Sequence, residues 1–121
     1  MTSPSQRKGD NAERELVGIL RDLTGWPVNR RYGAGARDDF GDLTGLPDTT
    51  IEVKSYTDVL RAIREGMDDL DVEQGHSQTT FGAVAMRRRG GKWMFVMDPD
   101  RFCTLLREAT APGSAAERRA S

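Results

Sequence analysis

The sequence predicts an α/β layer fold with a mixed central sheet, built from elements in the order α-β-β-β-α-β-β-α. Three segments place apolar residues at helical spacing, and short strand-like runs lie between them. Turns that contain glycine, proline or aspartate separate these elements. Helices and strands interleave along the chain, which predicts helices packed on a sheet so that each element buries one face. The 121 residues suit a single domain.

The first helix is predicted to begin at Asp10, after a flexible basic arm over residues 1–9. Asp10 at the N-cap and Glu13 three residues later fit a capping box. Gly25 then ends the helix, with Pro27 just beyond. The expected buried stripe consists of Ala12, Leu16, Ile19, Leu20 and Leu23.

Three short strands are expected next, over residues 28–32, 42–44 and 49–55. The segment GAGARDDFGD, over residues 33–42, is a long glycine-containing loop between the first two of them. The turn GLPD separates the second strand from the third, so we expect these two strands to pair as a hairpin.

A second helix is predicted from about Asp58 onward, followed by a loop over residues 73–80. Its acidic residues cover the outer side, and its predicted apolar stripe consists of Leu60, Ile63, Met67 and Leu70. Residues 81–87 and 93–97 form the next two strands. The turn RRRGGK joins them, because its glycines readily accept positive φ.

The last helix is predicted to begin at Asp98-Pro99, because proline is favoured at the first helical position. Its expected inner face consists of Phe102, Leu105, Leu106 and Ala109. Residues 110–121 are small and polar, which predicts a disordered tail. The folded domain is therefore expected to span residues 10–109.

Composition excludes several classes of protein. The formal net charge is −1, so the whole-chain charge identifies no partner, although Arg30, Arg31 and Arg37 cluster in one loop region. Cys103 is the only cysteine, which excludes a disulfide framework and a cysteine-based zinc site. His76 is the only histidine and is predicted to be an exposed loop residue. The sequence shows neither a signal peptide nor an apolar run of about 18 residues, so we expect a soluble, cytoplasmic protein without membrane contact.

The segment IEVKS, over residues 51–55, places a carboxylate and an ammonium group on one face of a strand. Side chains alternate along a strand, so Glu52 and Lys54 point to the opposite side from Ile51 and Val53. Taken in isolation, the pattern is explained by a solvated strand face that carries an ion pair. A chemical role needs further groups nearby.

Asp42 is the first such group. In the expected hairpin it lies near Glu52, because directly opposed strand residues have Cβ atoms about 4.5–5.5 Å apart. Two carboxylates that close repel each other unless a cation lies between them, and a hard divalent cation such as Mg²⁺ binds carboxylate and carbonyl oxygens. The backbone carbonyl of Val53 is a further candidate ligand. Lys54 is a candidate for holding or deprotonating a water that attacks a phosphodiester.

Glu13 is a third acid, at the rim of the buried stripe of the first helix, although a capping box explains it equally well. Asp38 and Asp39 are alternatives to Asp42, which is preferred because it precedes the apolar Leu43 and can enter the hairpin. The conjunction of these acids with the Glu-x-Lys pattern is less expected by chance than any one part.

The chain resembles the archaeal and phage-type Holliday-junction resolvases of the PD-(D/E)xK nuclease superfamily. The resemblance is carried by RKGDNAERELVGILRDLTG, NRRYGAGARDDFGDL and IEVKS, followed by a helix and the hairpin FGAVAMRRRGGKWMFV. It covers roughly residues 7–106 and depends on the order and spacing of these motifs. It implies a restriction-endonuclease-like three-layer fold and a Mg²⁺-dependent endonuclease that acts on branched DNA, with Mn²⁺ as a substitute cation.

The resemblance also implies roles for individual residues. The catalytic positions of the family fall on Glu13, Asp42, Glu52 and Lys54. The implied metal ligands are Asp42, Glu52, Val53 through its carbonyl, and Glu13. The candidate DNA-binding residues are Arg7, Lys8, Arg14, Arg30 and Arg31, together with Arg37 from the same basic loop.

The sequence departs from the family pattern at Gly41, where the superfamily motif has proline, and in the length of the loop before it. Many superfamily members place a polar residue after the Glu-x-Lys strand, and Gln74 and Gln78 are both candidates for it. The basic run over residues 87–89 is a solvated turn or a phosphate contact.

A resolvase cuts a four-way junction at two positions related by two-fold symmetry, so we expect a homodimer with two identical sites. The last hairpin and the final helix are the candidate dimer surface. The alternative functions are another PD-(D/E)xK DNA nuclease, of restriction or repair type, and a non-catalytic DNA-binding module of the same fold. A nucleoid location is expected with the same function, whereas the sequence leaves open whether the source is a cell or a phage or prophage.

Overall fold

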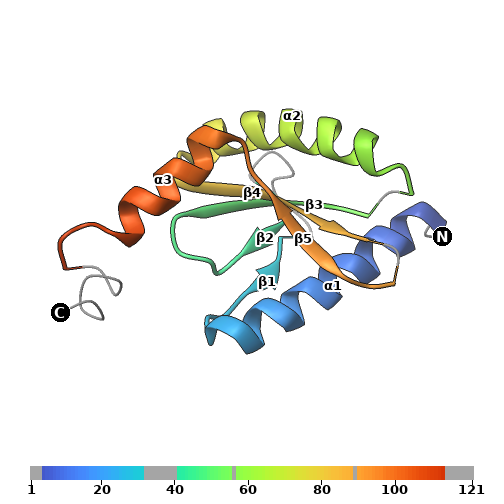
Figure 1. The fold of residues 1–121 in the computed structure, drawn as a ribbon. Helices are drawn as coiled ribbons and strands as arrows, with labels where there is room; N and C mark the ends of the chain where they lie inside the picture. Colours follow the sequence, from blue (N-terminus) through green and yellow to red (C-terminus); the bar gives the residue numbers. More distant parts are fainter. Residues whose placement is uncertain (1–3, 32–40, 56, 89, 114–121) are drawn as a thin grey trace.

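The computed structural model describes residues 4–31, 41–55, 57–88 and 90–113, apart from the side chains up to Lys8. Within these ranges the elements follow the order α-β-β-β-α-β-β-α (Figure 1). The helices are α1 (Pro4–Thr24), α2 (Val59–Ser77) and α3 (Pro99–Ala109). The strands are β1 (Asn29–Arg30), β2 (Leu43–Thr44), β3 (Thr49–Lys54), β4 (Phe81–Arg87) and β5 (Trp93–Val96).

The central sheet is mixed and has the strand order β3-β4-β5. β3 runs parallel to β4, with Glu52 opposite Val84, and β4 runs antiparallel to β5. A parallel pair needs a crossover connection, which α2 supplies between β3 and β4. The predicted α/β class with a mixed sheet is therefore confirmed, and β3 is an edge strand of that sheet.

β1 and β2 form a separate two-stranded antiparallel pair. The predicted hairpin between residues 42–44 and 49–55 is therefore wrong, because the backbone of β2 bonds to β1 instead. A backbone hydrogen bond still joins the two segments, since the Asp42 N–H donates to the Ile51 carbonyl at 3.0 Å. This bond keeps Asp42 beside β3 without a hairpin.

Helices cover both faces of the sheet, with α1 on one side and α2 and α3 on the other (Figure 1). The alternating side chains of β4 serve both interfaces: Ala83 and Ala85 belong to the α1 core, and Val84 and Met86 to the α2 core. The α1 core also contains Leu16, Val17, Leu20, Val28, Leu43 and Ile51, and the α2 core also contains Ala62 and Leu70.

α1 begins at Pro4 rather than at Asp10. Proline is favoured in the first helical turn because its missing N–H has no partner there in any case. The predicted capping box is therefore wrong: Asp10 and Glu13 lie inside the helix, and both form ion pairs with Arg30. The predicted stripe is correct in its middle, whereas Leu23 at its end is 77% exposed.

α2 begins as predicted, with Asp58 at the N-cap accepting a hydrogen bond from the Arg61 N–H at 3.1 Å. It continues to Ser77, so the predicted loop over residues 73–80 is helical in its first part. His76 is exposed as predicted, but it lies in the last turn of α2 and not in a loop.

The buried face of α2 differs from the predicted stripe. It consists of Ala62, Gly66, Leu70 and Glu73. Leu60, which the prediction places in the stripe, is 77% exposed. Gly66 permits a close approach to the sheet, because a Cβ there would lie 2.7 Å from Val84 Cγ1. The small residues Ala62 and Gly66 therefore allow a short distance between α2 and the sheet. This short distance brings acidic residues of α2 within reach of β3.

α3 begins at Pro99, as predicted. Its predicted inner face is wrong, because Phe102, Leu105 and Leu106 are 51%, 40% and 47% exposed and no described residue of α3 is buried. Polar contacts from Arg101 to α2 anchor the helix instead. The apolar side of α3 thus remains uncovered by the described part of the chain.

No helix within the described ranges is long and apolar enough to cross a membrane. The predicted tail lies mainly outside the described residues, since only 110–113 of it are described.

Candidate functional site

A cavity of about 290 Å³ opens beside β3 and the N-terminal half of α1. It is lined by Gly9, Asp10, Ala12, Glu13, Asp42, Glu52, Val53, Lys54 and Ser55. Every residue that the sequence predicts as catalytic or metal-binding is among them. The fold therefore gathers these groups from α1, from the segment before β2, and from β3.

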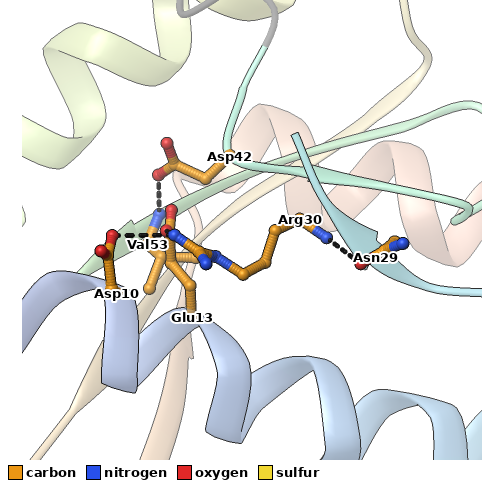
Figure 2. Close-up of polar contacts among 6 residues, drawn as sticks. All are labelled: Asp10, Glu13, Asn29, Arg30, Asp42 and Val53. Atoms are coloured by element: carbon orange, nitrogen blue, oxygen red, sulfur yellow. Dashed lines mark hydrogen bonds and ion pairs between the residues drawn. The ribbon is translucent and has the colours of Figure 1, made fainter. Parts of the chain in front are cut away.

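Asp42 is fixed by backbone hydrogen bonds. Its N–H donates to the Ile51 carbonyl at 3.0 Å, and its carbonyl accepts from the Arg31 N–H at 2.9 Å. Its Oδ2 accepts from the Val53 N–H at 2.7 Å (Figure 2). The preceding Gly41 has a φ of 100°, which proline cannot adopt because its ring holds φ near about −65°. A proline therefore does not fit the conformation found at this position.

Glu52 is buried and Asp42 is half-buried, and their carboxylate charges repel each other. Burial and then the charge of Glu52 raise the pKa of Asp42 to about 8, although the Val53 N–H lowers it. Burial and then the adjoining carboxyl group of Glu73 raise the pKa of Glu52 to about 9, against the lowering effect of Lys54. Such crowding of buried carboxyl groups is relieved by a proton or by a cation.

Lys54 lies between two acids. Its Nζ is 3.3 Å from Glu52 Oε1 and 2.8 Å from Asp69 Oδ2 on α2, and its side chain is 12% exposed. Glu52 and Lys54 therefore share a face of β3, as the alternation predicts, and that face is turned toward α2. The sequence analysis did not identify Asp69 as a neighbour of this site.

Glu13 reaches the cavity from α1 and is oriented by Arg30. The Arg30 Nε and Nη2 donate to Glu13 Oε1 at 3.2 and 3.0 Å, and Nη2 also donates to Asp10 Oδ1 at 2.8 Å (Figure 2). Burial raises the pKa of Glu13, and Arg30 lowers it. The sequence predicts a DNA contact for Arg30, whose 12%-exposed guanidinium is here bound to two carboxylates of its own chain. Its role within this structure is to position Glu13.

A second cavity, of about 560 Å³, lies along α1 and shares Asp10 with the first. Its basic lining residues are Arg14, Arg21 and Arg30. Arg14, a predicted DNA contact, is exposed on this wall, whereas the predicted contact Arg31 is half-buried at the end of β1. The basic groups therefore adjoin the acidic cavity on the α1 side.

Several candidates lie outside the described residues. They are Arg37, Asp38, Asp39 and Arg89, together with the side chains of Arg7 and Lys8. Asp42, preferred over the two loop aspartates, lies in the cavity with Glu52, as that preference requires.

The glutamine candidates do not join the cluster. Gln74 ties α2 to α3, because its Oε1 accepts a hydrogen bond from Arg101 Nε at 2.6 Å. Gln78 ends α2 in the left-handed conformation and is exposed. Arg87, in the predicted basic run, forms an ion pair with Glu15 of α1 at 2.8 Å. These residues support the fold around the site rather than the site itself.

The sequence analysis did not identify Glu73, which α2 places against Glu52. Glu73 is 9% exposed, and its carboxyl group contacts that of Glu52. Both groups are acceptors only when ionised, and the Oε2 atom of each has no hydrogen-bond donor among the described residues. The helical spacing of the buried residues Ala62, Gly66 and Leu70 continues to Glu73. The sequence analysis missed this because it predicted a loop over residues 73–80.

Within the described ranges, no group of three or more His, Cys, Asp or Glu side chains has an arrangement that could hold a metal ion. The carboxylates of the cluster are engaged by the Val53 N–H, Lys54 and Arg30. The chemistry of the donor set nevertheless fits a hard cation, because it consists of carboxylate oxygens and includes buried oxygens without a donor.

Comparison with family models, curated proteins and solved structures gave no match for this chain. The resemblance to the resolvases therefore depends on the motifs alone, and a function has to be argued from the cavity.

Proposed function

We propose that this protein is a divalent-metal-dependent DNA endonuclease of the PD-(D/E)xK type, and that it acts as a Holliday-junction resolvase. The observation that carries the proposal is the convergence of Glu13, Asp42, Glu52 and Lys54 on one cavity. Burial of ionisable groups opposes folding unless they are paired, so acids gathered in this way point to a chemical use. The mixed sheet with helices on both faces is compatible with the three-layer fold of restriction endonucleases.

The residues that would hold the cation are Asp42 and Glu52, with the Val53 carbonyl and Glu13 as further oxygen donors. Mg²⁺ is the proposed ion, and Mn²⁺ is expected to substitute for it. When bound, such a cation offsets the negative charge that develops on a phosphodiester attacked by water. The raised pKa values of Asp42 and Glu52 mean that protons compete with the cation for the same oxygens.

Lys54 is the residue best placed to act on the attacking water. Its ammonium group is 3.3 Å from Glu52, so it adjoins the oxygens proposed to hold the cation. A positively charged N–H donor in that place orients a water and stabilises charge in the transition state. On the α1 side, Arg30 keeps the Glu13 carboxylate turned toward the cavity.

The basic residues of α1 and β1 provide a path for the DNA backbone. The second cavity adjoins the acidic one, and Arg14 is exposed on its wall. Contacts from Arg and Lys to phosphates supply most of the affinity that does not depend on sequence. The proposed contacts are Arg7, Lys8, Arg14, Arg31 and Arg37, with Arg30 between this path and Glu13.

A homodimer follows from the proposed substrate. One chain supplies one acidic cluster, whereas a four-way junction is resolved by two cuts related by two-fold symmetry. The exposed apolar side chains of α3, Phe102, Leu105 and Leu106, offer a surface for such a pair. Phe95 of β5 is also exposed, but it pairs with Ala85 and therefore lies on the face of the sheet that α1 covers. The proposed place of action is the nucleoid in the cytoplasm, and a phage or prophage origin is compatible with it.

The decisive experiment incubates the protein with a labelled four-way junction and with a linear duplex of the same arm sequence, in Mg²⁺, Mn²⁺ or EDTA. Paired symmetric cuts in the junction, with either metal and not with EDTA, are expected. Equal cutting of the duplex would favour a restriction- or repair-type nuclease. Junction binding without cleavage in either metal would favour a non-catalytic module, and cleavage in excess EDTA would exclude the metal-dependent mechanism.

A further inference from the structure

Glu52 and Glu73 form a buried pair of carboxyl groups between β3 and α2. Glu52 is 5% exposed and Glu73 is 9% exposed, and their carboxyl groups are in contact. The Oε2 atom of each lacks a hydrogen-bond donor among the described residues, whereas Glu52 Oε1 lies 3.3 Å from Lys54 Nζ. Buried polar atoms are nearly always hydrogen-bonded, so an orphaned pair marks a place where a positively charged partner belongs.

The position of Glu73 is a consequence of how α2 packs. Glu73 continues the buried face of the helix, two turns after Gly66. A Cβ on Gly66 would lie 2.7 Å from Val84 Cγ1 and 3.3 Å from Lys54 Cγ, so the helix axis is drawn close to the sheet. Asp68, on the same helix, is exposed and solvated in the ordinary way. Glu73 is therefore not part of the acidic outer surface of α2.

Among the described residues around this pair, acidic groups outnumber ammonium groups. The carboxyl group of Glu52 contacts that of Glu73, the charges of Asp42 and Asp69 also act on Glu73, and Lys54 Nζ contacts Glu52 and Asp69. A divalent cation would neutralise the excess of carboxylate charge, because hard cations bind two or more carboxylate oxygens and keep several waters.

We propose that Glu52 and Glu73 bind a divalent cation of the Mg²⁺ class on the α2 side of β3, in addition to the position assigned to Asp42, Val53 and Glu13. The two orphaned Oε2 atoms are its protein ligands, and water completes its shell. The position shares Glu52 with the cluster proposed to cut DNA. Its use in cleavage rests on that proposed function, whereas the binding of the cation does not.

The competing explanation is a proton shared between the two carboxyl groups, which also turns their contact into a hydrogen bond. The two explanations differ in their response to Glu73→Gln. A glutamine amide can donate to Glu52 Oε2, so it satisfies the orphaned acceptor in either case. It removes a cation ligand only if a cation is bound there.

The test measures Mn²⁺ binding to the full chain by calorimetry or by electron paramagnetic resonance, without DNA. Wild-type protein is compared with Glu73→Gln and with the matched control Asp68→Asn, which removes one charge from the exposed side of the same helix. We expect Glu73→Gln to weaken Mn²⁺ binding by at least about tenfold and Asp68→Asn to leave it nearly unchanged. Equal affinity in wild type and Glu73→Gln, or equal losses in both variants, would overturn the proposal.

Thermal unfolding supplies a second readout, in which Glu73→Gln is expected to preserve the stability of the metal-free protein while it weakens the effect of Mn²⁺. In EDTA, Glu73→Gln should unfold at a temperature no lower than that of wild type, because its amide can donate a hydrogen bond to Glu52 Oε2. With Mn²⁺ added, the rise in unfolding temperature should be smaller in Glu73→Gln than in wild type, because a ligand stabilises the state that binds it. Should Glu73→Gln not fold, Glu73→Asp replaces it: withdrawing the carboxylate by one methylene should weaken Mn²⁺ binding, and unchanged binding would overturn the proposal.

The outcomes separate this inference from the proposed function. Metal-dependent cleavage together with unaltered Mn²⁺ binding in Glu73→Gln would leave the nuclease standing and reject the Glu52–Glu73 position. Mn²⁺ binding that requires Glu73, in a protein that cuts neither junction nor duplex, would keep the position and reject the nuclease.

Discussion

The regions at the two edges of the central sheet, β3 with α2 and β5 with α3, depart from the usual distribution of residues in opposite ways. At β3, the acids Glu52 and Glu73 are 5% and 9% exposed. At β5 and on α3, Phe95 and Phe102 are 47% and 51% exposed. Single exposed apolar residues are ordinary, whereas buried acids and several exposed apolar residues on one helix, Phe102, Leu105 and Leu106, are not. The proposed function uses the first region for chemistry and the second as the surface for a partner.

The packing of the two helices explains the difference. α2 meets the sheet through Ala62 and Gly66, so its backbone comes close and carries Glu73 into the interior. α3 has no buried residue along its described length and is held to α2 by polar contacts of Arg101 with Asp71 and Gln74. A close helix can bury a polar group, and a loosely anchored helix leaves its apolar side available.

The largest expected effect breaks the chemistry of the β3 side. Glu52→Gln, Asp42→Asn and Lys54→Ala should each lower the single-turnover rate of junction cleavage by about 10²- to 10⁴-fold, because each removes a group at the reacting phosphate. Junction affinity, measured by electrophoretic mobility shift in Ca²⁺, should change little. Asp68→Asn is the matched control and should cleave the junction at the wild-type rate. If Glu52→Gln also cleaves at the wild-type rate, the catalytic site does not lie at β3.

A comparison of two leucines on α2 tests the packing argument. Leu70 is fully buried and Leu60 is 77% exposed. Leu70→Ala should lower the free energy of unfolding by about 2–5 kcal/mol, because it leaves a cavity against the sheet. Leu60→Ala should change it by less than about 0.5 kcal/mol. Urea unfolding followed by circular dichroism measures both, and similar losses would mean that α2 is rotated from the described face.

Phe102→Asp tests the assignment of a partner surface to α3. A charge in the centre of an apolar interface should raise the dissociation constant of the homodimer by about 30-fold or more, which sedimentation at micromolar concentrations would detect. Leu60→Asp places the same charge on the exposed side of α2 and should leave the dimer intact. If wild-type protein sediments as a monomer of 13.4 kDa, the exposed face of α3 is not a surface for self-association.

The buried acids also predict how stability depends on pH in metal-free protein. The pKa of Asp42 is raised from 3.8 to about 8 and that of Glu52 from 4.5 to about 9 on folding. Between these limits the folded state binds more protons than the unfolded state, so the free energy of unfolding should fall as pH rises from about 5 to about 9.

Urea unfolding in EDTA at several pH values measures this slope. Burial and then the Glu73 carboxyl group raise the pKa of Glu52, so Glu73→Gln should make the slope shallower without abolishing it. A free energy of unfolding that rises over the same range would show that the pair is ionised in the metal-free fold.

The smallest expected effect concerns the DNA path. Arg14→Ala should reduce the dependence of log affinity on log salt by about one unit, because one phosphate contact is lost. Arg107→Ala, on the exposed surface of α3, should leave the slope unchanged. Equal changes in both variants would place the DNA elsewhere than along α1.

Much of the architecture could be predicted from local pattern. Asp58 and Pro99 mark the starts of α2 and α3, and the turn around the glycines 90–91 separates β4 from β5. These features depend on near neighbours in the chain, such as caps, fixed φ and permitted positive φ. The alternation in IEVKS likewise placed Glu52 and Lys54 on one face of β3.

Tertiary structure decided the partners of those elements. The hairpin predicted for residues 42–44 does not form, yet Asp42 still reaches the cavity through its bonds to Ile51 and Val53. Arg30 turned out to bind Glu13, and this pairing depends on how β1 lies against α1. Contacts of this kind join distant segments, and no local periodicity encodes them.

Local sequence patterns were enough to predict the helices and most strands, and to select Glu13, Asp42 and Lys54 as neighbours of Glu52. The position of Glu73 beside Glu52 depends on the tertiary structure. A helix continued to Ser77, with glycine and alanine at its contact, is needed to bring that carboxyl group to β3. Helix length and the depth of approach depend on packing against the whole sheet. Two neighbouring carboxylates repel each other, so the contact of Glu73 with Glu52 does not itself favour folding. The burial of Glu73 is therefore a result of the surrounding packing and not of the helix propensity of its own segment.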